Sequence, residues 1–155
     1  MAIETLQVQQ ALPVKPSDTI GIPDPRSLTI SSAATGTTSD KLVDSGGLFT
    51  TTNPISIGDI VYNSTDNTIT TVTNVDSATV LTLSDNIMAS GESYSIYRGT
   101  VDACLLYIGT TGNLKVKTTR DNIVTYTAVP VGFFPVHVKH VYATGTAASN
   151  IIANW

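Results

Sequence analysis

Two runs near the middle of the chain decide the fold class: Thr68-Ile69-Thr70-Thr71-Val72-Thr73-Asn74-Val75 and Ala78-Thr79-Val80-Leu81-Thr82-Leu83, separated by Asp76-Ser77. Apolar residues alternate with threonine in both runs, which is the period-two pattern of β-strands with one solvated face. Threonine itself favours strands because its branched Cβ restricts χ1. The two runs and the turn between them therefore predict an all-β protein.

The same texture of short strands and polar turns extends along the chain in both directions. Further strands are expected at residues 28–30, 58–63, 94–97, 104–108, 114–119, 123–127, 136–143 and 150–155. Strands that recur about every ten residues are typical of a small β-barrel or β-sandwich. We therefore expect a small, jelly-roll-like barrel or sandwich, with a second unit of similar texture in the last third of the chain.

The strand expected at residues 104–108 is unusual because nearly all of its residues are apolar. A strand that lacks alternation is typically covered on both faces. Cys104, the single cysteine, is then expected to be a small buried hydrophobe rather than a reactive thiol. No disulfide can form within the chain, so the fold must be stable without one.

The chain carries little charge for a soluble monomer. Charged residues make up 13% of it, against about 25% in ordinary domains, and Thr, Ser and Asn must supply the polar surface. The net charge of −4 and the scattered Lys and Arg argue against a nucleic-acid partner. No apolar run approaches the ~20 residues of a membrane helix, and residues 1–6 lack the pattern of a signal peptide. We expect cytoplasmic synthesis, no membrane partner and a surface suited to burial in an assembly.

Residues 1–25 are expected to form an extended arm. Its four prolines remove amide donors and push the preceding residues towards extended conformations: Pro13, Pro16, Pro23 and Pro25. An extended segment buries too little surface to be ordered by itself, so an ordered arm must lie on another surface. The alternative is a terminus without fixed structure. The candidate interface residues of the arm are Leu12, Pro13, Val14, Pro16 and Ile22.

Patterns of catalytic or metal-binding residues are missing from the sequence. His137 and His140 are three residues apart on an expected strand, so they point to opposite faces and cannot clamp one metal ion. Four aspartates fall at separate expected turns, where Asp caps its own backbone, rather than in the oxygen cluster that calcium needs: Asp59, Asp66, Asp76 and Asp85. Neither a phosphate-binding glycine loop nor a serine elbow is present. We therefore expect no enzymatic activity, no cofactor and no metal.

The remaining candidates are contact residues near the C-terminal end of the sequence. Phe133 and Phe134 lie in an expected loop, where one is expected in the core and the other as an interface anchor. Trp155, the single tryptophan, either caps a sheet of its own chain or packs into a neighbouring subunit. Both interpretations of Trp155 remain open from the sequence.

Five segments carry a likeness to known proteins: Pro16–Arg26, Leu106–Gly109, Gly112–Leu114, Val129–Gly132 and Pro135–Thr146. Together they resemble a family of small phage virion proteins, which includes spike-base proteins of phage-like gene-transfer particles and head decoration proteins of tailed phages. In the compact form of this family the arm is followed almost directly by the strand that begins here at Leu105. The residues that intervene in this chain resemble an inserted β-module of phage structural proteins.

The resemblance implies three parts: an extended N-terminal arm (residues 1–26), an inserted β-rich module (27–99), and a β-sandwich or barrel core (100–155) that packs with the arm. It also implies a virion protein, assembled in the host cytoplasm, that decorates the capsid as a cement protein or forms a spike base. Such a protein binds the major capsid protein or other virion proteins and forms homo-oligomers. Two alternatives stay open: a head-completion, tail-connector or tail structural protein, and a carbohydrate-binding module, which should expose aromatic platforms.

Overall fold

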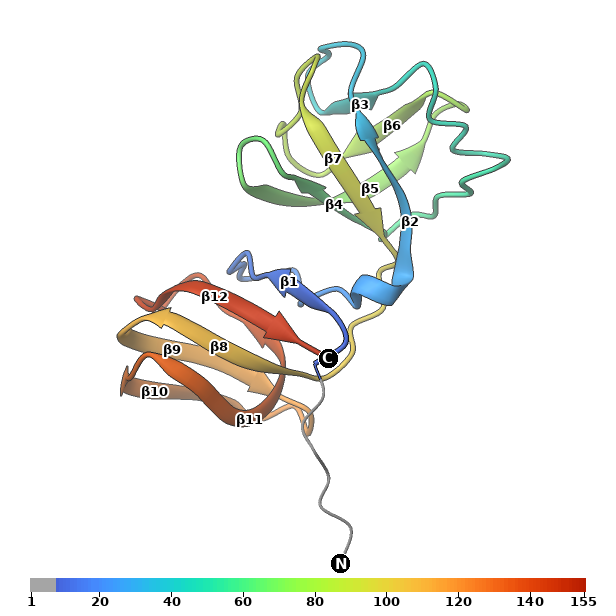
Figure 1. Ribbon diagram of the computed structural model, residues 1–155. Coiled ribbons are helices and arrows are strands. Elements are labelled where there is room, and N and C mark those ends of the chain that lie inside the picture. The colour runs from blue at the N-terminus through green and yellow to red at the C-terminus, as the bar shows by residue number, and fades with distance from the viewer. Residues whose placement is uncertain (1–7) are drawn as a thin grey trace, which may run out of the picture. The chain divides into compact units, whose positions relative to one another are not determined.

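The computed structural model describes residues 8–155 and confirms the all-β fold class (Figure 1). Its regular structure consists of twelve strands and one short 3-10 helix, η1 (Pro25–Ser27), and the described part contains no α-helix. The chain divides into two compact units, one formed by the N-terminal residues up to Pro25 with Asp102–Trp155, and the other by Arg26–Val101. The inserted module expected at residues 27–99 falls inside the second unit.

The first unit contains one six-stranded antiparallel sheet. Its strands are β1 (Ala11–Pro13), β8 (Cys104–Thr110), β9 (Gly112–Thr118), β10 (Ile123–Val129), β11 (Gly132–Val141) and β12 (Ser149–Asn154). They lie in the order β1-β12-β8-β11-β9-β10. Because β1 and β10 are edges that do not pair with each other, the sheet is open and does not close into a barrel.

Strand β11 joins the two halves of this sheet. Its first part, Gly132–Phe134, pairs with β8, and its second part, Val138–Val141, pairs with β9. The register shifts between the two parts, and such irregularities bend a strand. The bend lets the half with β8 and β12 face the half with β9 and β10 around a shared core, as in a sandwich (Figure 1).

The sequence predicted that β11 would begin only at Val136, after a loop containing Pro135, and this boundary is wrong. The strand starts at Gly132 and includes the proline. Pro135 has no amide to donate, but it lies where the register between Phe134 and Val138 shifts. The ladder is already interrupted there, and a proline is tolerated at such a position.

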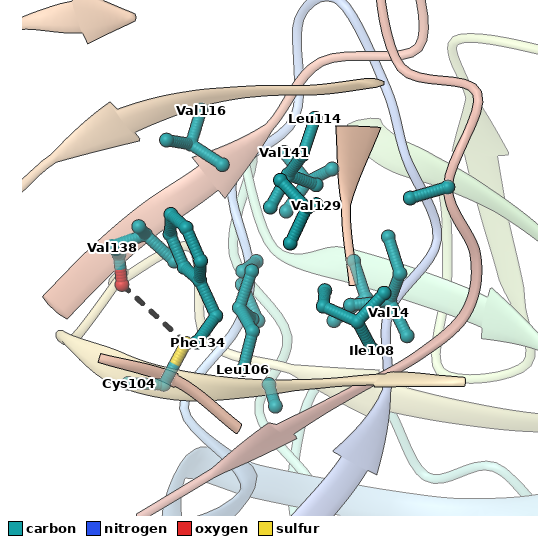
Figure 2. Packing of buried hydrophobic residues seen from close by; sticks show 14 residues of the cluster. Val14, Cys104, Leu106, Ile108, Leu114, Val116, Val129, Phe134, Val138 and Val141 are labelled. Atoms are coloured by element: carbon teal, nitrogen blue, oxygen red, sulfur yellow. Dashed lines mark hydrogen bonds between the residues drawn. The ribbon is translucent and has the colours of Figure 1, made fainter. Parts of the chain in front are cut away.

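Alternate residues of β8 build the core of the first unit (Figure 2). Cys104, Leu106 and Ile108 are at most 1% exposed, and Figure 2 shows them pointing into the same interior as the core residues of β9 and β11. Leu105 and Tyr107, which alternate with them, are only half-buried. The expectation that both faces of this strand are covered is therefore wrong, since only the inner face is.

The second unit also contains one six-stranded antiparallel sheet. Its strands are β2 (Leu28–Ala33), β3 (Lys41–Val43), β4 (Ile60–Asn63), β5 (Thr68–Val75), β6 (Val80–Leu83) and β7 (Ser93–Tyr97), in the order β2-β7-β4-β5-β6-β3. Strand β5 has the bounds that the alternating run predicted. The core of this unit includes Leu42, Phe49, Leu81 and Ile96, which are fully buried.

In two of the turns expected from the sequence, an Asn or Asp adopts a left-handed backbone conformation. Asn67 and Asp121 have φ angles of 66° and 65°, in the left-handed region. Asn and Asp tolerate this region better than other non-glycine residues because their short polar side chains hydrogen-bond locally. These turns set the registers of the β4–β5 and β9–β10 hairpins.

Candidate assembly surface

The described part of the arm packs against its own unit. Leu12, Val14 and Ile22, three of the expected interface residues, are 8%, 8% and 4% exposed. Val14 and Ile22 belong to the core of the first unit. These side chains are used by the chain's own fold, whereas Pro13 and Pro16 remain exposed. Residues 1–7 of the expected arm lie outside the described residues.

Backbone hydrogen bonds attach the arm along its length. Strand β1 pairs with β12, and three arm amides then donate to carbonyls of β11 and β12: Val14 to Ile151 (2.8 Å), Ser17 to Val141 (3.1 Å) and Ile22 to Lys139 (3.0 Å). Buried or half-buried amides need such partners. The arm is therefore an integral edge of the first unit.

Two side chains fasten the same segment. His140 Nε2 lies 2.6 Å from the carbonyl oxygen of Ser17, and its ring stacks on Tyr142 with centroids 4.3 Å apart. The Asp18 carboxylate accepts hydrogen bonds from the Thr144 amide (2.9 Å) and hydroxyl (2.7 Å). These hydrogen bonds hold the pKa of Asp18 below its usual value. Both polar residues thus position the arm rather than a ligand.

The aromatic candidates near the C-terminal end separate into three environments. Phe134 is 6% exposed and packs edge-on against Tyr126, with ring centroids 4.8 Å apart. Phe133 is 61% exposed. Trp155 is half-buried against the core, and its amide donates to the carbonyl of Gln10 at 3.0 Å. Of these residues, only Phe133 presents most of its side chain to solvent.

An apolar row crosses four neighbouring strands on the outer face of the first unit. Pro13 on β1 lies opposite Ile152 on β12, Ile152 lies opposite Tyr107 on β8, and Tyr107 lies opposite Phe133 on β11. Directly opposed residues of antiparallel strands point to the same face. We call these four residues the outer row. The chain neighbours of each member include a core residue, which places the row on the opposite, outward face.

The outer row is accessible and has an aromatic end. Ile152 is 37% exposed, Pro13 is exposed and Tyr107 is half-buried. The rings of Tyr107 and Phe133 meet edge-on, with centroids 5.6 Å apart and planes at 75°. Contiguous exposed apolar side chains that include aromatics are characteristic of surfaces that bind other proteins. The row is therefore the candidate site for assembly.

Sequence reasoning found two members of the outer row, Pro13 and Phe133, and missed Ile152 and Tyr107. A signal for the missing two was present. Tyr107 lies in the unbroken apolar run of β8, and Ile152 follows Ile151 in β12, so each strand presents apolar residues to both faces. The outer apolar side chains of these strands are left partly exposed by the fold of the first unit.

The described histidines and the cysteine differ in their surroundings. No group of three or more His, Cys, Asp or Glu that could hold a metal ion occurs within residues 8–155. The Cys104 thiol is buried, and burial raises its pKa to about 12, which keeps it protonated. His137 is exposed, whereas His140 is buried against the arm. None of the helices in that range is long and apolar enough to cross a membrane.

The second unit has a surface hollow of about 510 Å³ that contains Asp66 and Glu92. A hydrogen bond to Glu92 and its negative charge raise the pKa of Asp66. The Glu92 carboxylate also accepts hydrogen bonds from the Ala89 amide (2.6 Å) and the Asn63 side chain (2.9 Å). Glu92 therefore stabilises the turn that precedes β7.

No protein family, no curated protein and no solved structure matches this chain.

Proposed function

We propose that this protein is a structural component of a bacteriophage virion that attaches to the particle through the outer row. Its partner is the major capsid protein or another virion protein, and it works by binding rather than by turnover, as a decoration (cement) or spike-base protein. The observation that carries the proposal is the row itself, an exposed apolar stripe across four strands of one sheet.

The physical basis of attachment is burial of this stripe. Covering apolar surface stabilises a complex by roughly 25 cal/mol per Å² before the losses of motion and side-chain freedom are counted. Phe133 supplies the largest exposed side chain of the row, and aromatic residues commonly dominate binding energies at protein interfaces. The low charge content of the chain, 13%, also suits permanent contact, because little charge must be desolvated.

The virion assignment is supported by the resemblance of Pro16–Arg26 and Pro135–Thr146 to small phage virion proteins. Apart from Arg26, both segments belong to the first unit, and they contact each other: the Thr144 hydroxyl donates to Asp18, and the Ile22 amide donates to the carbonyl of Lys139. The segments with the strongest resemblance are thus neighbours in one fold. A head-completion or tail-connector protein would share these features, and its copy number per particle distinguishes it from a decoration or spike-base protein.

A carbohydrate-binding module is the second candidate because Tyr107 and Phe133 expose aromatic rings. Modules of this kind present flat platforms against which a sugar face stacks. The two ring planes lie at 75° to each other, so they do not form one flat platform. The geometry favours a protein partner, and binding on a glycan array would favour the carbohydrate alternative instead.

Co-sedimentation of the full-length protein with particles that lack it tests the outer row. The variant carries Phe133→Ser and Ile152→Ser, and the control carries Ile57→Ser and Leu28→Ser, two exposed apolar residues of the second unit. We expect the row variant to bind at least about tenfold more weakly, as for loss of interface anchors, and the control to bind like the wild type. Equal binding by both variants, with folding verified by circular dichroism, would contradict the proposal.

Counting copies in purified particles by quantitative mass spectrometry tests the place in the virion. Hundreds of copies indicate a decoration protein, multiples of five at vertices indicate a spike base, and about six or twelve copies indicate a connector ring. Absence of the protein from purified particles would overturn the virion assignment.

A further inference from the structure

Strand β10 forms a free edge of the first unit. It is the last strand in the sheet order, and within residues 8–155 it pairs only with β9. With seven residues it is longer than the other three edge strands, β1, β2 and β3. Ile123 and Val124 on β10 are 55% and 37% exposed. An edge strand of this length offers unpaired backbone groups along an apolar surface.

The backbone direction of β10 follows from its neighbours. At one end of the β9–β10 ladder, the Thr118 amide donates to the carbonyl of Asn122 at 2.9 Å, so these two residues form a hydrogen-bonded pair. Lys115 lies opposite Thr125, but its carbonyl accepts from the Tyr142 amide on the side of β9 away from β10, so Lys115 and Thr125 form a non-hydrogen-bonded pair. Hydrogen-bonded and non-bonded pairs alternate along an antiparallel ladder. The amides and carbonyls of Ile123 and Thr125, which lie before the register shift of β10, therefore point away from β9, towards the open edge.

The first part of β10, Ile123–Tyr126, lacks the usual protection against edge pairing, and the one irregularity of the strand lies after it, where the register shifts between Tyr126 and Val129 and Ala128 has a φ of 49°. Natural edge strands avoid pairing by being short, by a β-bulge, or by carrying lysine, proline or an inward-pointing charge. Strand β1 is short and contains Pro13, and β3 is short and contains Lys41. The sequence of β10, Ile-Val-Thr-Tyr-Thr-Ala-Val, contains no charge and no proline. It is rich in branched and aromatic residues, which favour strand pairing.

We propose that β10 pairs antiparallel with β10 of a second copy of this chain, about a two-fold axis at Thr125. Because the amide and the carbonyl of Thr125 point to the open edge, the two Thr125 residues can exchange hydrogen bonds across the axis. Ile123 then faces the partner's Thr127, and Val124 faces the partner's Tyr126. Aromatic and β-branched residues form favourable cross-strand pairs, so the exposed Val124 gains an apolar neighbour.

Charge favours a second copy over a charged partner strand. An uncharged strand opposed to itself brings no like charges together. In the joined sheet, Lys115 and its symmetry mate are separated by three strand spacings, roughly 14 Å, which exceeds the screening length of about 8 Å in physiological salt. Lys117, the other lysine of β9, is paired with Asp121 at 3.0 Å. The edge is therefore self-complementary in hydrogen bonding and charge.

A hollow beside β10 gives room for the partner. It has a volume of about 490 Å³ and is lined by Tyr126, Val129, Phe134, Pro135 and neighbouring residues of β10 and β11. Because Tyr126 forms part of its wall, the partner's Val124 lies at this hollow in the proposed register. The pairing deepens the proposed function and rests on it, since it names the contact through which copies associate.

The test places a charge on the two-fold axis. Thr125 is exposed, so Thr125→Lys leaves the core intact but sets two lysines opposite each other across the axis, and like charges directly opposite destabilise strand pairing. Within its own sheet position 125 lies opposite Lys115, so Thr125→Glu is tested as well: it meets a favourable charge there and a like charge only across the axis, and it should dissociate the dimer too. By sedimentation equilibrium of the full-length chain, we expect the wild type to form dimers and Thr125→Lys to dissociate at least about tenfold more readily. Mixing Thr125→Lys with Thr125→Glu should restore dimers of mixed composition. Thr73→Lys, at an exposed position of β5, is the matched control and should dimerise like the wild type.

Three results would overturn the pairing: a monomeric wild type, a dimer that Thr125→Lys leaves unchanged, or failure of the oppositely charged mixture to associate. The two proposals fail separately. A monomer that is still found in particles overturns strand pairing alone, whereas a Thr125-dependent dimer that is absent from particles overturns the virion function alone.

Discussion

The two units have the same number of strands but differ in how many polar side chains they bury. In the described residues of the first unit, His140 is the one buried polar side chain, and apolar residues appear on both faces of β8 and β12. The second unit buries four polar residues, Asp44, Asp59, Asn63 and Thr70. Both units leave apolar side chains exposed, so the number of buried polar side chains is what distinguishes the described residues of the two.

Buried carboxylates in the second unit close a long connection. Residues 44–59, between β3 and β4, contain no strand. At one end Asp44 accepts a hydrogen bond from the Tyr94 hydroxyl at 2.6 Å, and at the other Asp59 accepts from Arg98 at 3.1 Å. Charge-assisted hydrogen bonds of this kind are among the stronger ones in proteins. The difference teaches that side-chain hydrogen bonds within the second unit hold its long connection, whereas the first unit is the one to which we assign a contact surface.

The largest expected effect is on the free energy of unfolding, and it distinguishes a core residue of the first unit from a residue of the outer row. Phe134→Ala should lower the free energy of unfolding by about 3–5 kcal/mol, because it leaves a cavity beside Tyr126. Phe133→Ala, at a 61% exposed position, should lower it by less than about 1 kcal/mol. Urea unfolding followed by the fluorescence of Trp155, the single tryptophan, measures both. Equal losses would show that Phe133 serves the fold rather than the surface.

The next effect concerns the buried carboxylate of the second unit. Asp44→Ala leaves the Tyr94 hydroxyl buried without its acceptor and should destabilise the unit by about 2–4 kcal/mol. Hydrogen exchange of the β4 and β7 amides measures this loss. Adding Tyr94→Phe should recover part of it, because both polar partners are then removed. Ser45→Ala, at the exposed neighbouring position, is the control and should have little effect.

Acid should affect the second unit through the same carboxylate. Burial raises the pKa of Asp44, but hydrogen bonds from Tyr94 and Gly46 lower it by more, so the net pKa lies below the usual value. A depressed pKa in the folded state stabilises the protein above the unfolded value, about pH 4, and this stability is lost as the pH falls through the folded value. Urea midpoints at descending pH should fall less steeply for Asp44→Ala than for the wild type. Identical slopes would assign the acid sensitivity to other groups.

The smallest effect is on the rate at which Cys104 is alkylated, which reports how often the first unit opens. The Cys104 thiol is 1% exposed and has a pKa raised to about 12 by burial, so an alkylating reagent should modify it only when the unit opens. Phe134→Ala should accelerate the labelling, and Asp44→Ala should not. Rapid labelling of the native wild type would contradict the packing of β8.

The regular parts of the fold were predictable, because local patterns encode them. The alternating run at Thr68–Val75 predicted β5 with its bounds, and the turn at residues 120–122 separated β9 from β10. Strand β3 and the early start of β11 were missed. A three-residue strand has too little sequence for periodicity, and Pro135 is accommodated in a strand because the register between β11 and β8 shifts at its own position.

The candidate surface was only half predictable, for a related reason. The sequence predicted contact residues in the proline-rich arm and among the C-terminal aromatics. Pro13 and Phe133 are indeed exposed, but Leu12 and Val14 of the same arm are buried. Whether an apolar residue of the arm points inward depends on how β1 pairs with β12. That pairing joins residues more than a hundred positions apart, and no local pattern reveals it.

The sequence by itself determined the all-β class, the positions of most strands and the apolar character of β8, because these depend on alternation and on turn residues close in the chain. The tertiary structure decided which strands are neighbours, which face of β8 is covered and which strand is left as an open edge. These properties depend on registers between distant segments, and a shift of one residue would exchange the inner and outer faces.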